Sequence, residues 1–309
     1  MSKKRVLVIG ATGTMGRYLV PELVQLGFQV TGVSLDMPAV PVDGVEYRTG
    51  NCYDLDFLAS LVEQKFDGIV NFMTFPQKYP FEKYYKLFLD NTDHYIFLSS
   101  CRVYADEEWP VKETSPRLVD VSKDQALLDS YDYCMHKARA EDLLWASGYE
   151  NFTIVRPATT FSESMFKLVT WEAPHTIARA RKGKKVVLPI QAKDKPATLC
   201  WGGDVAKMIA RLMFKPETMK EAYNVCSSEH HTWGEIAEFF EQLCGLKAVW
   251  VDKEDYLLAM ERSPIRDTEI KHVLKNALTD EIDSREVYMK GIDHSYYYEG
   301  YATFKAEEL

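Results

Sequence analysis

The chain has 309 residues, of which 46% are hydrophobic and 27% are charged, an ordinary balance for a globular protein. The formal net charge of −9 disfavours nucleic acid as a partner, because contact with phosphate backbones favours a basic surface. No apolar run approaches the roughly 18 residues that span a bilayer, and the polar start Met1–Arg5 has no signal-peptide core. We therefore expect a cytoplasmic protein that binds neither nucleic acid nor membranes.

Six cysteines are scattered along the chain without a Cys-x-x-Cys pair, and the one adjacent histidine pair is His230-His231. Neighbouring residues on one chain rarely share a metal ion, and isolated cysteines in a chain of this size are usually buried thiols. We expect reduced cysteines and no metal site.

The first predicted element is a strand over residues 6–9, a short apolar run that suits a strand covered on both faces. A loop with three glycines follows, and the helical pattern begins near Tyr18. Glycine lets the backbone turn sharply and lets phosphate approach it, while a helix start offers unpaired N–H groups. The pattern predicts a dinucleotide-binding turn. The residues expected at the cofactor are Gly10, Thr12, Gly13, Thr14, Met15 and Gly16.

The end of the second strand, residues 30–33, normally selects the cofactor, because an acidic side chain there repels a 2′-phosphate. The corresponding position is Ser34, with Asp36 two residues further on and Arg17 just beyond the glycine turn. Serine is neutral toward a phosphate, so both NAD and NADP stay open, with NAD favoured. Ser34 itself is expected at the cofactor.

Strands and helices then alternate, with strands over residues 45–48, 68–73, 94–98 and 152–157 and helices over 55–65 and 84–91. This alternation predicts an α/β protein with a Rossmann-type, doubly wound parallel sheet, whose ligands lie outside the carboxyl ends of the strands. Further cofactor contacts are therefore expected at these ends, from Asn51, Cys52, Phe72, Met73, Thr74 and Ser99.

A helix is predicted to begin at Tyr133, because the run that follows is rich in helix formers and has no Gly or Pro until Gly148. Tyr133 and Lys137 are four residues apart and share a face of this helix. A nearby ammonium group lowers the pKa of a tyrosine, which makes the phenol a usable acid or base. The spacing predicts a catalytic pair.

Beyond Pro157 the regular alternation stops. We predict a helix over residues 163–182 interrupted by Pro174, a helix over 203–213, a strand over 222–226, and a helix over 236–243 with a cap at 232–235. These elements favour a Rossmann domain over residues 1–160, to which the segment around 200–228 returns. Residues 161–309 would mainly form a smaller, mixed substrate-binding lobe.

Together these motifs span about residues 5–245 in a consistent order, and they make the chain similar to one known family. They are Gly10-x-x-Gly13-x-x-Gly16, Ser99-Ser100 with Val103-Tyr104, Tyr133-x-x-x-Lys137, Arg156-Pro157, Gly203-Asp204-Val205-Ala206 and Thr232-Trp233-Gly234-Glu235. The chain resembles the extended short-chain dehydrogenase/reductase superfamily, in its NAD-dependent epimerase/dehydratase branch.

The resemblance implies that Tyr133 is the acid/base, that Lys137 binds the nicotinamide ribose and lowers the tyrosine pKa, and that Ser100 hydrogen-bonds the reacting oxygen. It also places Arg156 and Pro157 at the cofactor. The substrate contacts that we expect are Thr74, Cys101, Arg102, Thr159 and Thr160.

Three positions depart from the family pattern. Sugar-nucleotide 4,6-dehydratases have an Asp-Glu pair where this chain has Cys101 and Arg102, so dehydration is not expected. Many sugar-nucleotide epimerases have an Asn at the position of Thr159, and an Arg where this chain has Ala197 and Thr198. Both of those residues usually serve the nucleotide diphosphate.

The leading hypothesis is an NAD(P)-dependent epimerase or reductase that acts at a secondary alcohol or ketone carbon, in a sugar nucleotide or related sugar. The alternative is a non-catalytic, nucleotide-sensing or RNA-binding relative. Family members commonly dimerise through the helix that carries Tyr133 and the helix before it, so a homodimer is expected. The apolar residues of these helices face either a partner or their own sheet; they are Tyr84, Tyr85, Phe88, Leu143 and Trp145.

Overall fold

The structure is a computed structural model, and it describes residues 3–261 except 106, 109, 164, 170, 229 and 230. The described residues form two compact units. The first contains residues 3–162 and 199–228, and the second contains 163–198 and 231–261. The predicted lobe is therefore described only as far as residue 261.

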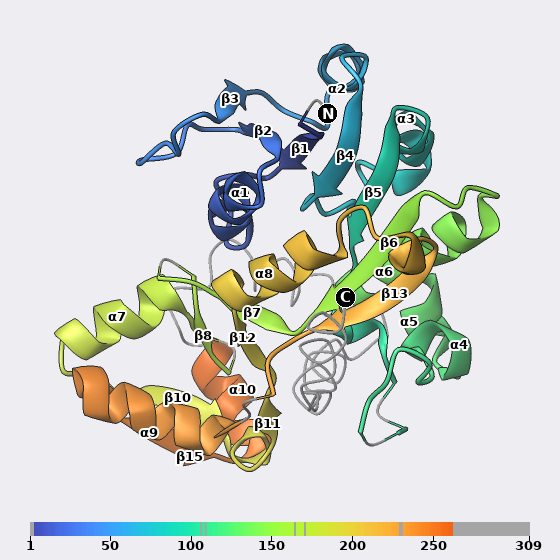
Figure 1. Cartoon of the computed structure of the whole chain (residues 1–309). Coiled ribbons are helices and arrows are strands. Elements are labelled where there is room, and N and C mark those ends of the chain that lie inside the picture. Colours follow the sequence, from blue (N-terminus) through green and yellow to red (C-terminus); the bar gives the residue numbers. More distant parts are fainter. Residues whose placement is uncertain are drawn as a thin grey trace. The chain divides into compact units, whose positions relative to one another are not determined.

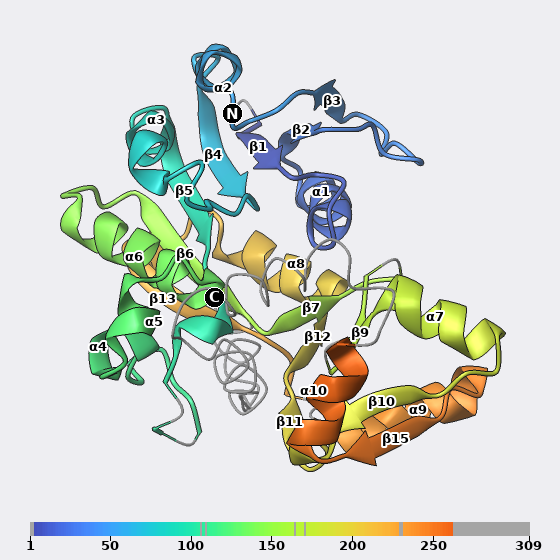
Figure 2. The same ribbon diagram turned by 180° about the vertical axis from the view of Figure 1, so that it is seen from behind.

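The first unit is built on a seven-stranded sheet whose paired neighbours are all parallel. The strand order is β13-β6-β5-β4-β1-β2-β3, which can be followed in Figures 1 and 2. The strands are β1 (Arg5–Ile9), β2 (Gln29–Ser34), β3 (Glu46–Thr49), β4 (Phe66–Asn71), β5 (Thr92–Leu98), β6 (Phe152–Pro157) and β13 (Glu221–Val225). The predicted Rossmann-type α/β fold is confirmed.

Helices cover both faces of this sheet. One buried apolar cluster joins α2 (Leu55–Val62), α3 (Tyr85–Leu89) and α6 (Tyr133–Ala146) to side chains of β1, β4, β5 and β6. Helices α1 (Gly16–Gln25) and α8 (Gly202–Leu212) contact each other and lie together in Figures 1 and 2. Alternate strand residues point to opposite faces, so uninterrupted apolar strands such as β1 can be buried on both.

The apolar side chains considered for a dimer interface divide between the two alternatives. Tyr84 and Phe88 are buried in the core cluster, so they face their own sheet. Trp145 is partly exposed and packs edge-on against Phe152. These contacts leave the homodimer as a prediction.

Short elements complete the first unit. They are η1 (Phe81–Lys83), η2 (Cys101–Val103), α4 (Leu118–Val121), α5 (Gln125–Asp129), η4 (Pro216–Thr218), and the parallel pair β7 (Thr159–Phe161) and β12 (Leu199–Trp201). The Asp54, Asp124 and Asp132 side chains cap α2, α5 and α6 by accepting backbone N–H groups of the first turn.

The second unit is made of short paired strands and three helices in its described part. Its strands pair as β8 (Lys167–Leu168) with β9 (Trp171–Glu172), β10 (Val186–Pro189) with β15 (Ala248–Val251), and β11 (Pro196–Ala197) with β14 (His231–Thr232). The helical elements are α7 (Ala173–Arg181), η3 (Ile190–Ala192), α9 (Trp233–Cys244) and α10 (Lys253–Glu261). The predicted cap at Thr232 is present as a complete capping box with Glu235.

One element of the second unit was wrongly predicted. The described residues of the region 163–172 are not helical: they include the antiparallel strands β8 and β9, and α7 begins only at Ala173. Pro174 therefore lies in the first turn of a helix instead of interrupting one, a position where its missing N–H costs nothing.

None of the six cysteines forms a disulfide bond, and only Cys244 is exposed. Within the described residues, no helix has the length and apolar character needed to cross a bilayer.

Candidate active site

The glycine loop lies at the carboxyl end of β1, directly before α1. Gly10 has φ +86°, in the left-handed region that favours glycine, and its N–H donates to the Val33 carbonyl at 2.8 Å. A Cβ on Gly16 would lie 2.1 Å from the Gly10 carbonyl oxygen, so no other residue fits there. The loop is therefore tight enough to bring backbone and helix start against a pyrophosphate, which fits a dinucleotide cofactor.

Ser34 and Asp36 both reach back to this loop through Thr12. The Thr12 N–H donates to Ser34 Oγ at 3.0 Å, and the Thr12 hydroxyl donates to Asp36 Oδ1 at 3.0 Å. Arg17 donates to the Thr12 carbonyl at 3.2 Å. The Asp36 carboxylate and the Arg17 guanidinium thus both contact Thr12. Because a carboxylate repels a 2′-phosphate and a guanidinium attracts one, these contacts do not distinguish NAD from NADP.

The residues after β3 and β4 have local contacts of their own. Asn51 Oδ1 accepts the Tyr53 N–H at 3.0 Å, and Cys52 is buried. The Tyr53 hydroxyl donates to the Thr74 carbonyl, which ties the segment after β4 to the segment after β3. Phe72 lies against the glycine loop, because a Cβ on Gly10 would be 3.0 Å from the Phe72 Cβ.

Tyr133, Ser100 and Lys137 come together at the carboxyl end of β5. Ser100 follows this strand by two residues and is buried, and its side chain forms a hydrogen bond with Tyr133. Tyr133 and Lys137 lie on successive turns of α6, and the Lys137 Nζ is 5.8 Å from the centre of the Tyr133 ring. The structure therefore brings the three predicted catalytic residues to one place.

Protein carbonyls hold the Lys137 side chain, which is 1% exposed. Its Nζ donates to the Leu98 carbonyl at 2.6 Å and to the Met73 carbonyl at 3.4 Å. Burial lowers the pKa of Lys137 to about 7, and the buried carboxylate of Glu141 opposes this effect. The ammonium charge is thus only partly developed at neutral pH.

The predicted direction of the Tyr133 pKa shift is wrong for this structure. Burial raises the pKa of Tyr133, and the hydrogen bond with Ser100 and the charge of Arg102 offset only part of that rise. Lys137 does not reverse the shift, because its own charge is weakened by the same burial. Tyr133 is therefore a neutral phenol, the acid form of the couple, at neutral pH.

The two residues after Ser100 differ in exposure. Cys101 is buried, whereas the Arg102 side chain is 46% exposed. The Arg102 guanidinium lies 5.7 Å from the centre of the Tyr133 ring and 3.8 Å from the Asp132 carboxylate. Of the two, Arg102 is the one placed to meet a ligand beside Tyr133.

Other predicted contacts lie at the ends of β5 and β6. The Ser99 hydroxyl is fully buried and has no hydrogen-bond partner among the described residues. Thr160, in β7 beyond Pro157, donates to the Ala158 carbonyl at 3.2 Å and lies 3.8 Å from the Met15 sulfur. Thr159 begins the same strand. Thr160 thus adjoins the glycine loop.

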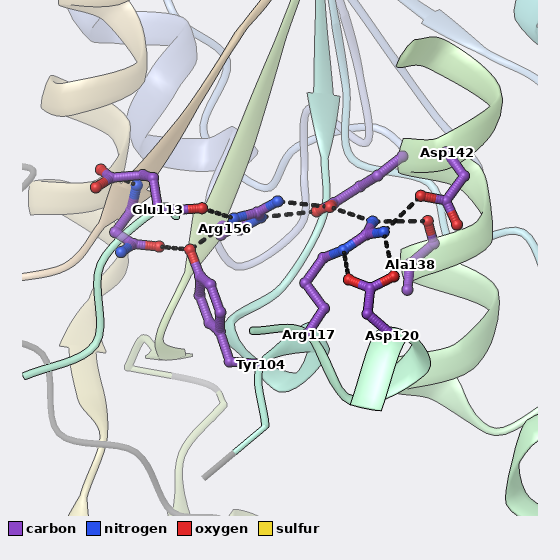
Figure 3. A network of polar contacts seen from close by, with 9 residues as sticks. Tyr104, Glu113, Arg117, Asp120, Ala138, Asp142 and Arg156 are labelled. Atoms are coloured by element: carbon purple, nitrogen blue, oxygen red, sulfur yellow. Dashed lines mark hydrogen bonds and ion pairs between the residues drawn. The ribbon is translucent and has the colours of Figure 1, made fainter. Parts of the chain in front are cut away.

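Arg156 has a different environment from the one implied for a cofactor ligand. It is 4% exposed, and its guanidinium donates to both Glu141 carboxylate oxygens at 2.9 and 2.7 Å. It also donates to the Tyr104 hydroxyl at 2.7 Å and to the Glu113 carbonyl at 2.9 Å. Figure 3 shows this network and the neighbouring Arg117, which contacts Asp120, Ala138 and Asp142. The Arg156 side chain therefore binds protein groups that join β6 to α6.

Glu141 is the residue of this network that sequence reasoning missed. It is completely buried, stands four residues after Lys137, and also accepts from Arg117 at 3.3 Å. Tyr133, Lys137 and Glu141 thus follow one another at helical spacing on α6. This repeat was visible in the sequence, but a buried carboxylate is recognised only once its arginine partners are known.

Comparisons with known proteins identify the family and the fold of the chain. The model of the NAD-dependent epimerase/dehydratase family matches residues 6–226. The chain belongs to this family. The match covers the glycine loop, Ser100, Tyr133, Lys137 and the returning strand β13.

Solved structures of epimerases and dehydratases share the fold. An epimerase from Methanothermobacter thermautotrophicus has a TM-score of 0.66 and 18% identity, with 82% of each chain covered. The dTDP-glucose 4,6-dehydratase of Bacillus anthracis, solved with NAD, has a TM-score of 0.63 and 16% identity, covering 81% of this chain and 84% of that one. The UDP-glucose 4-epimerase of Thermotoga maritima, solved with UDP-glucose, has a TM-score of 0.60 and 16% identity, covering 82% and 87%.

Proposed function

We propose that this member of the epimerase/dehydratase family is an NAD(P)-dependent epimerase or reductase that acts at a secondary alcohol or ketone carbon. The observation that carries the proposal is the hydrogen bond between Ser100 and Tyr133, on the same helix face as the buried Lys137. A hydroxyl pair of this kind can bind one carbonyl or alcohol oxygen and exchange a proton with it.

Each residue has a defined task in this proposal. Ser100 hydrogen-bonds the reacting oxygen, and Tyr133 gives a proton to a carbonyl oxygen or takes one from an alcohol. Lys137, fixed by the Leu98 and Met73 carbonyls, orients the ribose of the cofactor and supplies positive charge when the phenolate forms. A bound nicotinamide would supply or accept the hydride.

The cofactor-contact residues keep their predicted roles within the proposal. The glycine loop, Ser34, the segments after β3 and β4, and Ser99 line the cofactor side of the sheet edge. Arg156 contributes by holding β6 against α6. We propose a sugar nucleotide or related sugar as substrate, on the grounds of the family and of the UDP-glucose and dTDP-glucose enzymes that share the fold.

The deciding experiment replaces Tyr133 by Phe. We expect turnover to fall by about 10²–10⁴-fold, because the variant lacks the proton that the reaction exchanges, while bound nicotinamide nucleotide is retained. The matched control is Tyr131→Phe, since Tyr131 is exposed and lies two residues before the site. Turnover is followed with UDP-glucose and UDP-glucuronic acid as substrates, by chromatography of the sugar products. Full activity in Tyr133→Phe would contradict the proposal.

The nucleotide that remains on the purified protein distinguishes the two reactions. An epimerase reoxidises and reduces one cofactor in place, so stoichiometric NAD after gel filtration supports epimerisation. A reductase releases its oxidised cofactor, so consumption of added NADPH or NADH with a ketone substrate supports reduction. If the wild-type protein neither retains NAD nor consumes added NADPH or NADH, the non-catalytic alternative is favoured.

A further inference from the structure

Arg102 differs from the other arginines around α6 in how its donors are used. Arg117, Arg139 and Arg156 each donate hydrogen bonds to protein carbonyls or carboxylates. The Arg102 guanidinium makes no hydrogen bond to any described residue, and its one ion pair, with Asp132, is 3.8 Å long. Its donors are available to a ligand.

The ion pair with Asp132 is a weak competitor for such a ligand. Asp132 Oδ1 already accepts the Cys134 N–H at 3.0 Å and the Cys134 thiol at 2.9 Å, as the cap of α6. The side chains of Arg102 and Asp132 are 46% and 29% exposed. Exposed pairs of this kind contribute about 0–1 kcal/mol, so a ligand can displace Asp132 at little cost.

The position of Arg102 connects it to the proposed chemistry. Its guanidinium lies 5.7 Å from the centre of the Tyr133 ring, and Lys137 Nζ lies 5.8 Å from the same centre. Lys137 is buried and bound to carbonyls, whereas Arg102 is open. A ligand that reaches the Tyr133 hydroxyl therefore comes close to Arg102, whose N–H donors are available to it.

A guanidinium presents five N–H donors in a plane that matches the two oxygens of a carboxylate or phosphate. We propose that Arg102 binds an oxyanion, a carboxylate or a phosphate, carried by the substrate close to its reacting carbon. This inference rests on the proposed function for the location of that carbon. It defines the substrate class as an acidic sugar, and it makes Arg102 the residue that selects it over the neutral sugar.

The test compares pairs of sugars in which one member carries a carboxylate or phosphate that the other lacks. Dissociation constants are measured by calorimetry for UDP-glucuronic acid against UDP-glucose, and for glucose 6-phosphate against glucose, on protein saturated with NAD. The first pair reports on a carboxylate and the second on a phosphate. In the wild-type protein we expect at least one acidic ligand to bind about tenfold or more tightly than its neutral partner, as a charge-assisted bidentate contact allows.

Three variants assign this preference to Arg102. Arg102→Gln should bring the acid-to-neutral ratio to about one, and Arg102→Lys should keep part of it, because lysine preserves the charge but not the planar fork. Arg211→Gln is the matched control, since Arg211 is 44% exposed and pairs with Glu22 on α1. The control should keep the wild-type ratio.

The result that would overturn the inference is a wild-type protein without preference for either acidic ligand, or an Arg102→Gln variant that keeps the preference. Because the readout is binding, Tyr133→Phe should leave the ratio of dissociation constants unchanged while it lowers turnover. Failure of the catalytic proposal and failure of the oxyanion proposal are thus seen in different measurements.

Discussion

Arg156 and Arg102 both lie near α6 at the carboxyl edge of the sheet, yet their environments are opposite. Arg156 is buried, and its guanidinium donates hydrogen bonds to Glu141, Tyr104 and Glu113. Arg102 is half exposed and, among the residues that the structure describes, its guanidinium contacts one carboxylate, that of Asp132, at 3.8 Å. The comparison shows two uses of arginine. A guanidinium whose N–H donors are bound by protein groups stabilises the fold, whereas one whose donors are available beside a reactive group can select a ligand.

The largest expected effect on stability comes from removing the ion pair between Arg156 and Glu141. Glu141→Gln removes the charge that compensates Arg156, so we expect the free energy of unfolding in urea to fall by about 3–5 kcal/mol. Asp142→Asn is the control, because Asp142 is half exposed and pairs with Arg117 at 2.6 Å. It should cost about 0–1 kcal/mol. Equal losses in the two variants would refute the distinction between buried and exposed partners.

A second prediction concerns Lys137, the buried lysine that lies between Tyr133 and Glu141 on α6. The unfolded chain keeps its proton to about pH 10.5, whereas burial lowers the pKa in the folded protein to about 7. The unfolded state therefore binds more protons between these values, and the free energy of unfolding should rise with pH there, by up to about 1.4 kcal/mol per pH unit. Lys137→Met should remove this rise. Parallel pH dependences in both proteins, measured by urea unfolding, would show that Lys137 is not held neutral.

A third prediction concerns one oxygen atom of the buried network, the Tyr104 hydroxyl. The Tyr104 hydroxyl donates to Asn224 Oδ1 and accepts from Arg156, both at 2.7 Å. Tyr104→Phe leaves those partners incompletely satisfied, so we expect a loss of about 1–3 kcal/mol in unfolding free energy. Tyr149→Phe, at an exposed hydrogen bond to Asp90, is the matched change and should cost less. The ranking of the two midpoints in urea decides the point.

The smallest effect on stability should come from Arg102 itself. Arg102→Gln removes one long, exposed ion pair, so the unfolding free energy should stay within about 0.5 kcal/mol of the wild-type value. The same variant should lose the preference for acidic ligands. A loss of several kcal/mol would mean that Arg102 belongs with Arg156 as a structural residue.

Much of the first unit follows from local sequence patterns. The apolar run of β1, the glycines at 10 and 16, and the helix that starts at Tyr133 each have a local cause, so their positions were predictable. The end of the fifth strand also placed Ser100 at the carboxyl edge of the sheet, whereas its meeting with Tyr133, the first residue of α6, was implied by the family resemblance.

What could not be predicted depends on burial and on distant partners. The Tyr133 pKa rises because the surrounding structure removes water, and no spacing in the sequence reports that. Glu141 is satisfied by arginines 15 and 24 residues away along the chain. The two-residue strands β8 and β9 are too short to show a period, so a helical composition misled the prediction for residues 163–172.

The outermost strand β13 has a consequence for how the protein is made. It pairs with β6, although more than sixty residues, including the start of the second unit, separate the two strands along the chain. During synthesis, β6, whose residues are all buried in the folded protein, has an open edge until residue 225 has emerged. Nascent chains that end before β13 expose the unpaired backbone edge of β6, which can pair with strands of other chains. Truncated versions of this protein that stop near residue 162 should therefore precipitate, and those that extend past residue 228 should be far easier to express.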